Sequence, residues 1–166
     1  MNDKDAAWLA GYIDGDGTIS LIAKSKHHFR SPQISASCTD EEILLHIKSL
    51  IGGYIRPGPL KKNCRSVLQW HLAGANKVIS VLIQIEPFLR CLVKKQRALL
   101  ILENWSKVTK RNGCYDTKTI WAKHLFEKAF FNIGADRCIR QRIQVIPKIR
   151  IVGREVEDAS VLTKKI

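Results

Sequence analysis

The fold of this chain is restricted first by one nine-residue stretch, Leu-Ala-Gly-Tyr-Ile-Asp-Gly-Asp-Gly at residues 9–17. Its first half is small and apolar, as a closely packed helix requires, and its second half places Asp14 and Asp16 between glycines. The C-terminal end of a helix carries partial negative charge, so a carboxylate there costs about 0.3–1 kcal/mol unless a cation offsets it. Two aspartates at such a position therefore indicate a function rather than a structural need.

The charge balance indicates a polyanionic partner. The chain has 166 residues with 28 Lys and Arg against 15 Asp and Glu, which gives a formal net charge of +13. A nucleic acid is the partner that this balance favours, because neutralising phosphates releases condensed counterions. A membrane surface is the competing partner, but no single segment reads as a basic amphipathic helix. The length predicts one domain over residues 1–166.

Cysteine usage and hydropathy restrict the environment of the chain. The five cysteines are odd in number and widely spaced, and none forms a C-x-x-C pair, which is typical of free thiols in a reducing compartment. The N-terminus is polar, and no apolar run approaches the length of a membrane span. We therefore expect a soluble intracellular protein without a membrane partner.

Residue periodicity predicts a helix followed by a hairpin. Asn2 or Asp3 caps a helix over residues 4–14. From Thr18 the period changes to two, with Ile19, Leu21 and Ala23 inward and Ser20, Ile22, Lys24 and Lys26 outward. In the next strand Ile34, Ala36 and Cys38 share one face, and Gln33, Ser35 and Ser37 share the other. The hairpin has one polar face.

The rest of the chain continues this pattern. A helix capped by Thr39 or Asp40 runs to residue 51, and strands follow at residues 54–56 and 66–72. Helices are predicted over residues 74–85 and 93–108. The elements up to residue 85 are in the order αββαββα, and the class is α+β. Beyond this core of residues 4–108, we expect a C-terminal extension over residues 109–166, with a helix at 118–132 and a strand at 143–152.

Residues 9–17 resemble the LAGLIDADG signature of homing endonucleases. They match it at every position but two, because Tyr12 replaces an aliphatic residue and Gly15 replaces a small one. Residues 34–42 resemble the second strand and the next helix start of that family, and residues 87–89 and 94–98 resemble its proline turn and basic helix start. The resemblance implies a saddle-shaped αββαββα unit whose antiparallel sheet lies along the DNA major groove.

This chain carries one copy of the motif. In this respect it resembles the homodimeric branch of the family, in which two motif helices pack about a twofold axis. The resemblance implies an interface made by Trp8, Ala10, Gly11, Ile13 and Asp14. Ala10 and Gly11 lack bulk, which allows two helix backbones to approach closely. The alternative is a central helix buried in a monomer and ended by a glycine.

The resemblance also implies catalytic residues. Asp16 matches the acid that binds the metal ion, and the backbone carbonyl of Gly15 lies near the ion. The implied ion is Mg²⁺, with Mn²⁺ as a substitute, and the implied reaction is in-line hydrolysis of a phosphodiester. Asp14 is expected to cap its own helix. Lys95 aligns best with a basic residue near the active site, and Lys94 is the alternate.

The outward positions of the predicted strands are polar and basic. Arg and Gln read guanine and adenine edges, and lysines contact phosphates. The predicted DNA contacts are Ser20, Ile22, Lys24, Lys26, His28, Arg30, Gln33, Ser35, Ser37, Arg56, Lys61, Lys62, Arg65, Gln69 and His71.

Together with the basic composition, the resemblance implies a homodimeric, Mg²⁺-dependent endonuclease that cuts both strands of a long palindromic or near-palindromic DNA target. Cys38 stands where relatives usually have Asn or Gln, so Ser37 or Thr39 is the alternative residue for holding solvent there. A DNA-binding protein without cleavage and an RNA-splicing maturase are the alternative functions.

Overall fold

The computed structural model describes residues 1–23, 25, 28–59, 66–110 and 115–134. In chain order the described elements are α1 (Asp3–Asp16), β1 (Gly17–Ile22), β2 (Ser31–Cys38), α2 (Glu41–Ile51), β3 (Tyr54–Pro57), β4 (Leu68–Ala73), α3 (Ala75–Ile85), the 3-10 turn η1 (Glu86–Phe88), α4 (Leu92–Val108) and α5 (Thr117–Asn132). The predicted α+β class and αββαββα order are confirmed. Helix α4 follows these elements within the predicted core, and α5 lies in the predicted C-terminal extension. The predicted strand at residues 143–152 lies outside the described residues.

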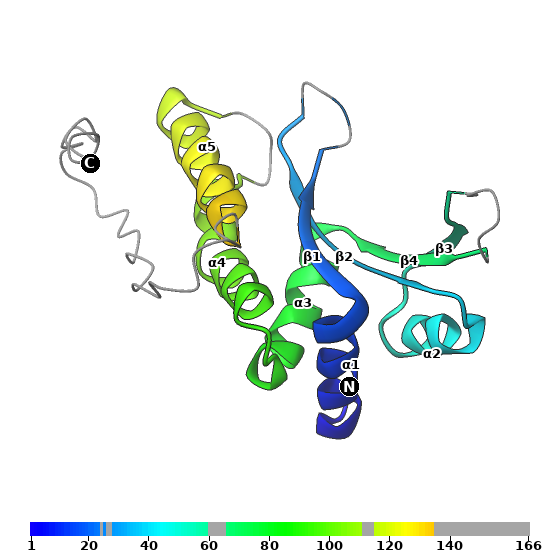
Figure 1. The fold of residues 1–166 in the computed structure, drawn as a ribbon. Helices are drawn as coiled ribbons and strands as arrows, with labels where there is room; N and C mark the ends of the chain where they lie inside the picture. The colour runs from blue at the N-terminus through cyan, green and yellow to red at the C-terminus, as the bar shows by residue number, and fades with distance from the viewer. Residues whose placement is uncertain (24, 26–27, 60–65, 111–114, 135–166) are drawn as a thin grey trace, which may run out of the picture. The chain divides into compact units, whose positions relative to one another are not determined.

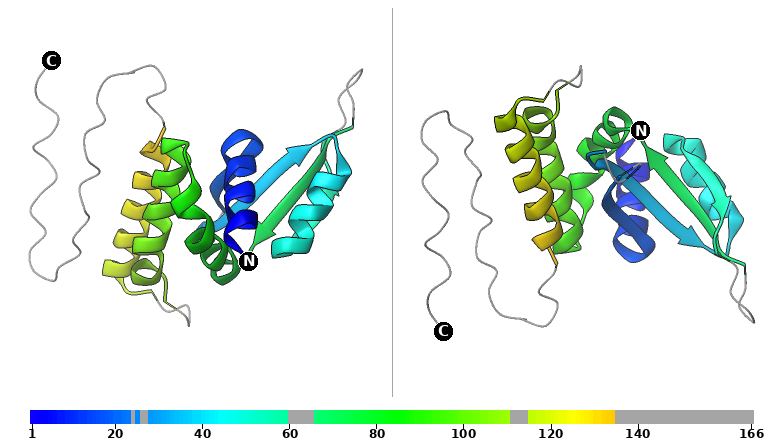
Figure 2. Two further views of the ribbon diagram at one scale, coloured as in Figure 1. Left: turned by 90° about the horizontal axis from the view of Figure 1, so that it is seen from below. Right: turned by 90° about the horizontal axis from the view of Figure 1, so that it is seen from above.

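The four strands form one antiparallel sheet in the order β1-β2-β4-β3. Helices α1, α2 and α3 all contact the strands and cover one face of the sheet, while α4 and α5 lie beside its β1 edge (Figures 1 and 2). The predicted alternation is confirmed, because Ile19, Leu21, Ile34 and Leu72 are buried under the helices. The opposite face of the sheet carries the polar positions and is not covered by these three helices.

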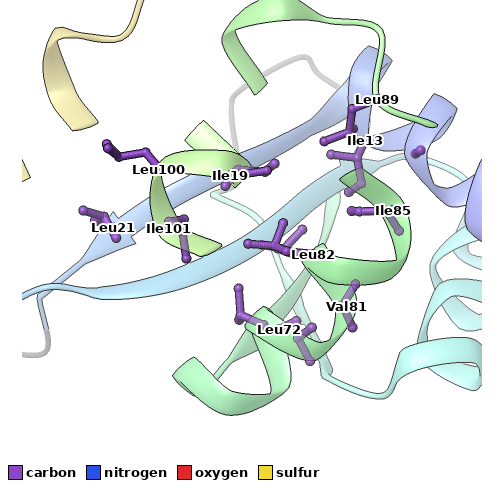
Figure 3. Packing of buried hydrophobic residues seen from close by; sticks show 14 of the residues in the cluster. Ile13, Ile19, Leu21, Leu72, Val81, Leu82, Ile85, Leu89, Leu100 and Ile101 are labelled. Atoms are coloured by element: carbon purple, nitrogen blue, oxygen red, sulfur yellow. The ribbon is translucent and has the colours of Figure 1, made fainter. Parts of the chain in front are cut away.

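The core lies between the sheet and the helices. Figure 3 shows Ile13 of α1, Ile19 of β1, Leu82 of α3 and Ile101 of α4 pointing into the same space. All four are 0% exposed. Residues far apart in the sequence therefore join in one apolar cluster that fixes α1 and α4 against the same sheet.

The boundaries of α1 follow from its end residues. The Asn2 side chain accepts a hydrogen bond from Asp5 N at 2.8 Å and so caps the first turn. The helix continues to Asp16, two residues beyond the predicted end at Asp14. Gly17 then follows, where an added Cβ would lie 2.6 Å from the Ile13 Cα atom, so a side chain does not fit. Both aspartates of the motif consequently belong to the last turn of α1.

No helix in the described part of the chain is long and apolar enough to span a membrane.

A buried lysine lies between α4 and α5. Lys123 is 1% exposed, and its Nζ atom lies 3.4 Å from the centroid of the Trp105 ring and donates a hydrogen bond to Thr109 Oγ1 at 2.8 Å. Burial lowers the pKa of Lys123 to about 8, and the nearby negative charge of Glu127 opposes that change only in part. The α4–α5 contact is therefore sensitive to pH.

We expect the contribution of Lys123 to stability to grow at alkaline pH. Between pH 8 and 10.5 the unfolded chain binds this proton more strongly than the folded chain, so the free energy of unfolding rises with pH. Relative to a Lys123→Met variant, the wild type should gain roughly 2–3 kcal/mol between pH 7 and pH 10, measured by urea unfolding. An equal difference between the two proteins at both pH values would contradict this expectation.

Candidate active site

The end of α1 exposes two groups of the motif that offer oxygen atoms. Gly15 and Asp16 are both exposed, and a Cβ added at Gly15 would meet no atom within 4 Å. The carboxylate of Asp16 makes no hydrogen bond or ion pair with any described residue. Asp16 is therefore the motif aspartate that is available to a ligand.

Asp14 has a structural role that differs from the predicted one. Its Oδ2 atom accepts hydrogen bonds from Arg90 N at 2.5 Å and from Cys91 N at 3.1 Å, and so holds the turn between η1 and α4. The prediction that Asp14 caps its own helix is wrong, because the N–H groups that need an acceptor precede α4 rather than following α1. Asp14 was also predicted to lie at the interface with a second chain. Its Oδ2 atom is instead hydrogen-bonded within its own chain, to Arg90 N and Cys91 N.

Lys94, in the first turn of α4, meets the end of α1. Its Nζ atom donates to the carbonyl oxygens of Ile13 and Asp14, each at 2.7 Å, and lies 3.4 Å from that of Gly15. This ammonium group is the cation that offsets the partial negative charge of the helix end. Lys95, the preferred residue in the sequence prediction, instead pairs with Glu86 Oε1 at 3.5 Å. The structure therefore places the alternate, Lys94, at the motif.

Tyr12 and Cys38 form part of the surroundings of the motif. Burial raises the pKa of the Tyr12 phenol, and the neighbouring Cys38, Asp16 and Asp40 raise it further. The Cys38 Sγ atom accepts a hydrogen bond from Asp40 N at 3.3 Å, before the start of α2. Cys38 lies partly buried at the end of β2, whereas Ser37 is exposed on the open face of the sheet.

The exposed face of α1 differs from the predicted interface. Ala10 and Ile13 are 0% exposed, so the prediction that they contact a second chain is corrected: both side chains are buried in the core of the same chain. The exposed face instead carries Ala7, Gly11 and Gly15 at intervals of four residues, with Trp8 beside them. Trp8 is 41% exposed and stacks on Tyr12.

Polar side chains cross the open face of the sheet in rows. Cross-strand pairing aligns Thr18 with Ser35 and His71, and it aligns Ser37 with Gln69 and Arg56. Ser20, Ile22, His28, Ser35, Ser37, Arg56 and Gln69 are all at least partly exposed. Lys24, Lys26, Lys61, Lys62 and Arg65 lie outside the described residues.

The prediction that Gln33 and His71 both contact DNA directly is corrected by their burial. They are 9% and 7% exposed, because the Gln33 Nε2 and His71 Nδ1 atoms lie 2.6 Å apart and the ring of Tyr54 stacks on His71. Burial, together with the positive charge of Arg56, lowers the pKa of His71. This pair is therefore covered by its neighbours on the sheet.

The comparisons with known proteins agree with this geometry. The family model described as LAGLIDADG endonuclease matches residues 9–115, which is more than half of the chain. This chain belongs to the LAGLIDADG endonuclease family. The fold is also similar to that of the homing endonuclease I-CvuI in complex with the I-CreI target, with a TM-score of 0.61 and 21% identity over 87% of this chain and 88% of that one. I-CvuI in complex with its own target gives a TM-score of 0.60 and 22% identity over 87% of each chain.

We expect alanine substitutions at Asp14 and Asp16 to have different effects on the free energy of unfolding. Asp14→Ala should lower the free energy of unfolding by about 1–3 kcal/mol, because it leaves the N–H groups of Arg90 and Cys91 without their acceptor. Asp16→Ala should change it by less than about 0.5 kcal/mol, because Asp16 is exposed. Urea unfolding at pH 7 measures both, and equal losses would contradict the assigned roles.

Proposed function

We propose that this LAGLIDADG protein is a sequence-specific homing endonuclease that cuts both strands of DNA as a homodimer and depends on a divalent metal ion. The observation that carries the proposal is the division between the two motif aspartates. Asp14 is used by the turn before α4, while Asp16 stands exposed at the end of a helix whose charge Lys94 already offsets. An exposed carboxylate that the fold does not use is available for chemistry.

The donor groups at this helix end fit a hard cation such as Mg²⁺. The Asp16 carboxylate and the Gly15 carbonyl offer oxygen ligands, which Mg²⁺ prefers and Mn²⁺ accepts. Among the described residues, no three His, Cys, Asp or Glu side chains lie close enough together to hold a metal ion. A second Asp16, supplied by a second copy, would complete the acidic ligands. A bound ion there would polarise the phosphate and make its water more acidic.

Several neighbouring residues affect the charge and the surface around the end of α1. Lys94 neutralises the carbonyl oxygens, so an approaching phosphate meets less negative charge from the helix. Tyr12 and Trp8 provide apolar surface along the same helix. Lys95 remains a candidate for contact with solvent or phosphate, because its side chain is 36% exposed despite its pairing with Glu86.

The exposed face of α1 supports dimerisation. A Cβ added at Gly11 or Gly15 would meet no atom within 4 Å, so a second helix can approach this face closely. A twofold axis through the face brings the two ends of α1 together and gives an isologous interface of Trp8, Ala7 and Gly11. A symmetric dimer reads a symmetric site, which supports a palindromic or near-palindromic target.

The open face of the sheet is proposed as the DNA-binding surface. Arg56 and Gln69 offer hydrogen bonds suited to base edges, Ser37 lies in the same row, and Ser35 lies in the next row. The formal charge of +13 supplies non-specific attraction to phosphates. We further propose that residues 1–166 act as a single functional domain.

Cys38 favours one alternative, a DNA-binding protein or maturase of this fold that does not cut DNA. Its thiol accepts a hydrogen bond from Asp40 N and is a poorer solvent ligand than an amide. The decisive experiment incubates the protein with a library of randomised DNA duplexes with or without Mg²⁺. Discrete double-strand cuts only with Mg²⁺ support the proposal, whereas retention of specific sequences without cuts supports the alternative.

We expect Asp16→Asn to abolish cleavage while specific binding to a DNA selected from the library persists. Loss of an outer-shell partner of a metal commonly costs 10- to 100-fold, so loss of a direct ligand should lower the cleavage rate by at least about 100-fold. Asp3→Asn, the same substitution at the other end of α1, is the matched control and should cut normally. Unchanged cleavage by the Asp16→Asn variant contradicts the mechanism.

We expect Gly11→Leu to fold as a monomer. The position has room for a side chain within the subunit, and leucine is the better helix former by about 0.8 kcal/mol, so the subunit should not lose stability. The added side chain would separate two helices packed on this face. Light scattering at micromolar concentration should show a dimer for the wild type and a monomer for the variant, with Gly11→Ala as a smaller step between them. A wild-type monomer that binds specific DNA would contradict the symmetric dimer.

A further inference from the structure

Among the described residues, both carboxylate oxygens of Glu127, on α5, accept hydrogen bonds from Arg30 in the β1–β2 connection. The Oε1 atom accepts a hydrogen bond from Arg30 N at 3.0 Å, and the Oε2 atom accepts one from Arg30 Nη1 at 2.8 Å. Glu127 is 8% exposed, whereas the side chain of Arg30 is 45% exposed. Because the carboxylate holds both the main chain and the guanidinium group of Arg30, it fixes the path of the backbone as well as a charge.

Further contacts join the same segment to α5. We call residues 28–30, which lead into β2, the arm. The Phe29 ring lies 5.3 Å from that of Tyr115 and 5.6 Å from that of His124, and Arg30 Cζ lies 5.0 Å from the Phe131 ring centroid. His124, Glu127 and Phe131 are three and four residues apart and so share one face of α5. One face of α5 therefore contacts Phe29 and Arg30 of the arm, and Tyr115, just before α5, adds a further contact to Phe29.

The sheet alone does not hold the arm. Strand β1 ends at Ile22 and β2 begins at Ser31, so residues 28–30 lie beyond the last paired residues of the ladder. β1 is also the edge strand of the sheet, and a two-stranded ribbon is marginally stable without a second layer. Figure 1 shows α4 and α5 beside this edge, and α5 provides the missing layer for the arm.

We infer that Glu127 is a positioning residue that sets the arm for reading the outer base pairs of each half of the DNA target. The inference rests on the proposed function. Asp16 precedes the first residue of β1, and Ile22, the last residue of that strand, is six residues further along the chain. Ile22 pairs with Ser31, which directly follows the arm, so the arm lies near this far end of β1. At about 3.3 Å per residue, the six residues of β1 span roughly 20 Å, or about six base pairs at 3.4 Å each. Glu127 therefore controls sequence preference far from the cut, and not the chemistry at Asp16.

The first test compares two variants that lose the same charge. Glu127→Gln keeps the volume but offers one acceptor oxygen to the two donors of Arg30, and Glu103→Gln makes the same change at an exposed position on α4. Each protein cuts the randomised duplex library with Mg²⁺, and the cut products are sequenced. For Glu127→Gln we expect preference to fall about tenfold at positions about six base pairs or more from the centre, with central preferences and the cleavage rate at saturating DNA unchanged. Glu103→Gln should match the wild type.

The second test needs no DNA. Hydrogen exchange of the intact Glu127→Gln protein should be about tenfold faster at the amides of residues 28–31 than in the wild type, and unchanged in β4 and α2. Phe29→Ala removes a different contact between the arm and α5 and should give the same pattern. It keeps the inference testable if Glu127→Gln does not fold.

Three outcomes would overturn the inference. Uniform loss of preference across the site would show a general folding defect, and unchanged exchange in the arm would show that Glu127 does not anchor it. Tighter binding by Glu127→Gln would show that the carboxylate restrains Arg30 from binding DNA instead of positioning it. If the wild type cuts no member of the library, the proposed function fails and the role in specificity fails with it, whereas faster exchange in the arm would still establish the anchoring.

Discussion

Lys94 places its ammonium group against the last carbonyl oxygens of α1, and the arrangement around the motif depends on that contact. A helix that ends in two carboxylates needs a nearby cation, and the neighbouring helix supplies one. In turn, the Asp14 carboxylate accepts hydrogen bonds from the N–H groups of Arg90 and Cys91, just before α4. The end of α1 and the start of α4 thus satisfy each other, which leaves Asp16 as the motif acid that the fold does not use.

The sequence predicted the sheet well, because the burial of one face is decided by local alternation. Ile19, Leu21, Ile34 and Leu72 are buried as their period of two predicted. It favoured Lys95 over Lys94 near the motif, whereas the structure places Lys94 there. Successive residues on a helix point about 100° apart, so the docking of α4 against α1 decides which lysine meets the motif, and that docking depends on contacts distant in sequence.

Two other predictions failed for a related reason. Alternation places Gln33 and His71 on the polar face, but it does not show that Tyr54 covers one of them and that they pair with each other. Along α1 the apolar residues occupy several faces, so the sequence indicates that a second surface contacts the helix without showing which residues face it. The structure assigns Ala10 and Ile13 to the core and leaves Gly11 exposed.

Helices α4 and α5, which follow the αββαββα elements in the chain, contact residues at both ends of β1. α4 supplies Lys94 at the motif, before the first residue of the strand, and α5 supplies Glu127 beyond its last residue. The two helices are tied to each other by the hydrogen bond from Lys123 to Thr109 and by the edge-on packing of Trp105 on Phe126. An edge strand is paired on one side only, so contacts from other elements add to the pairing that holds it in place. Because one helical pair contacts both ends of β1, the fold fixes Asp16 and the arm relative to that strand. In the proposed endonuclease, this would set the spacing between the cut and the bases that the arm reads.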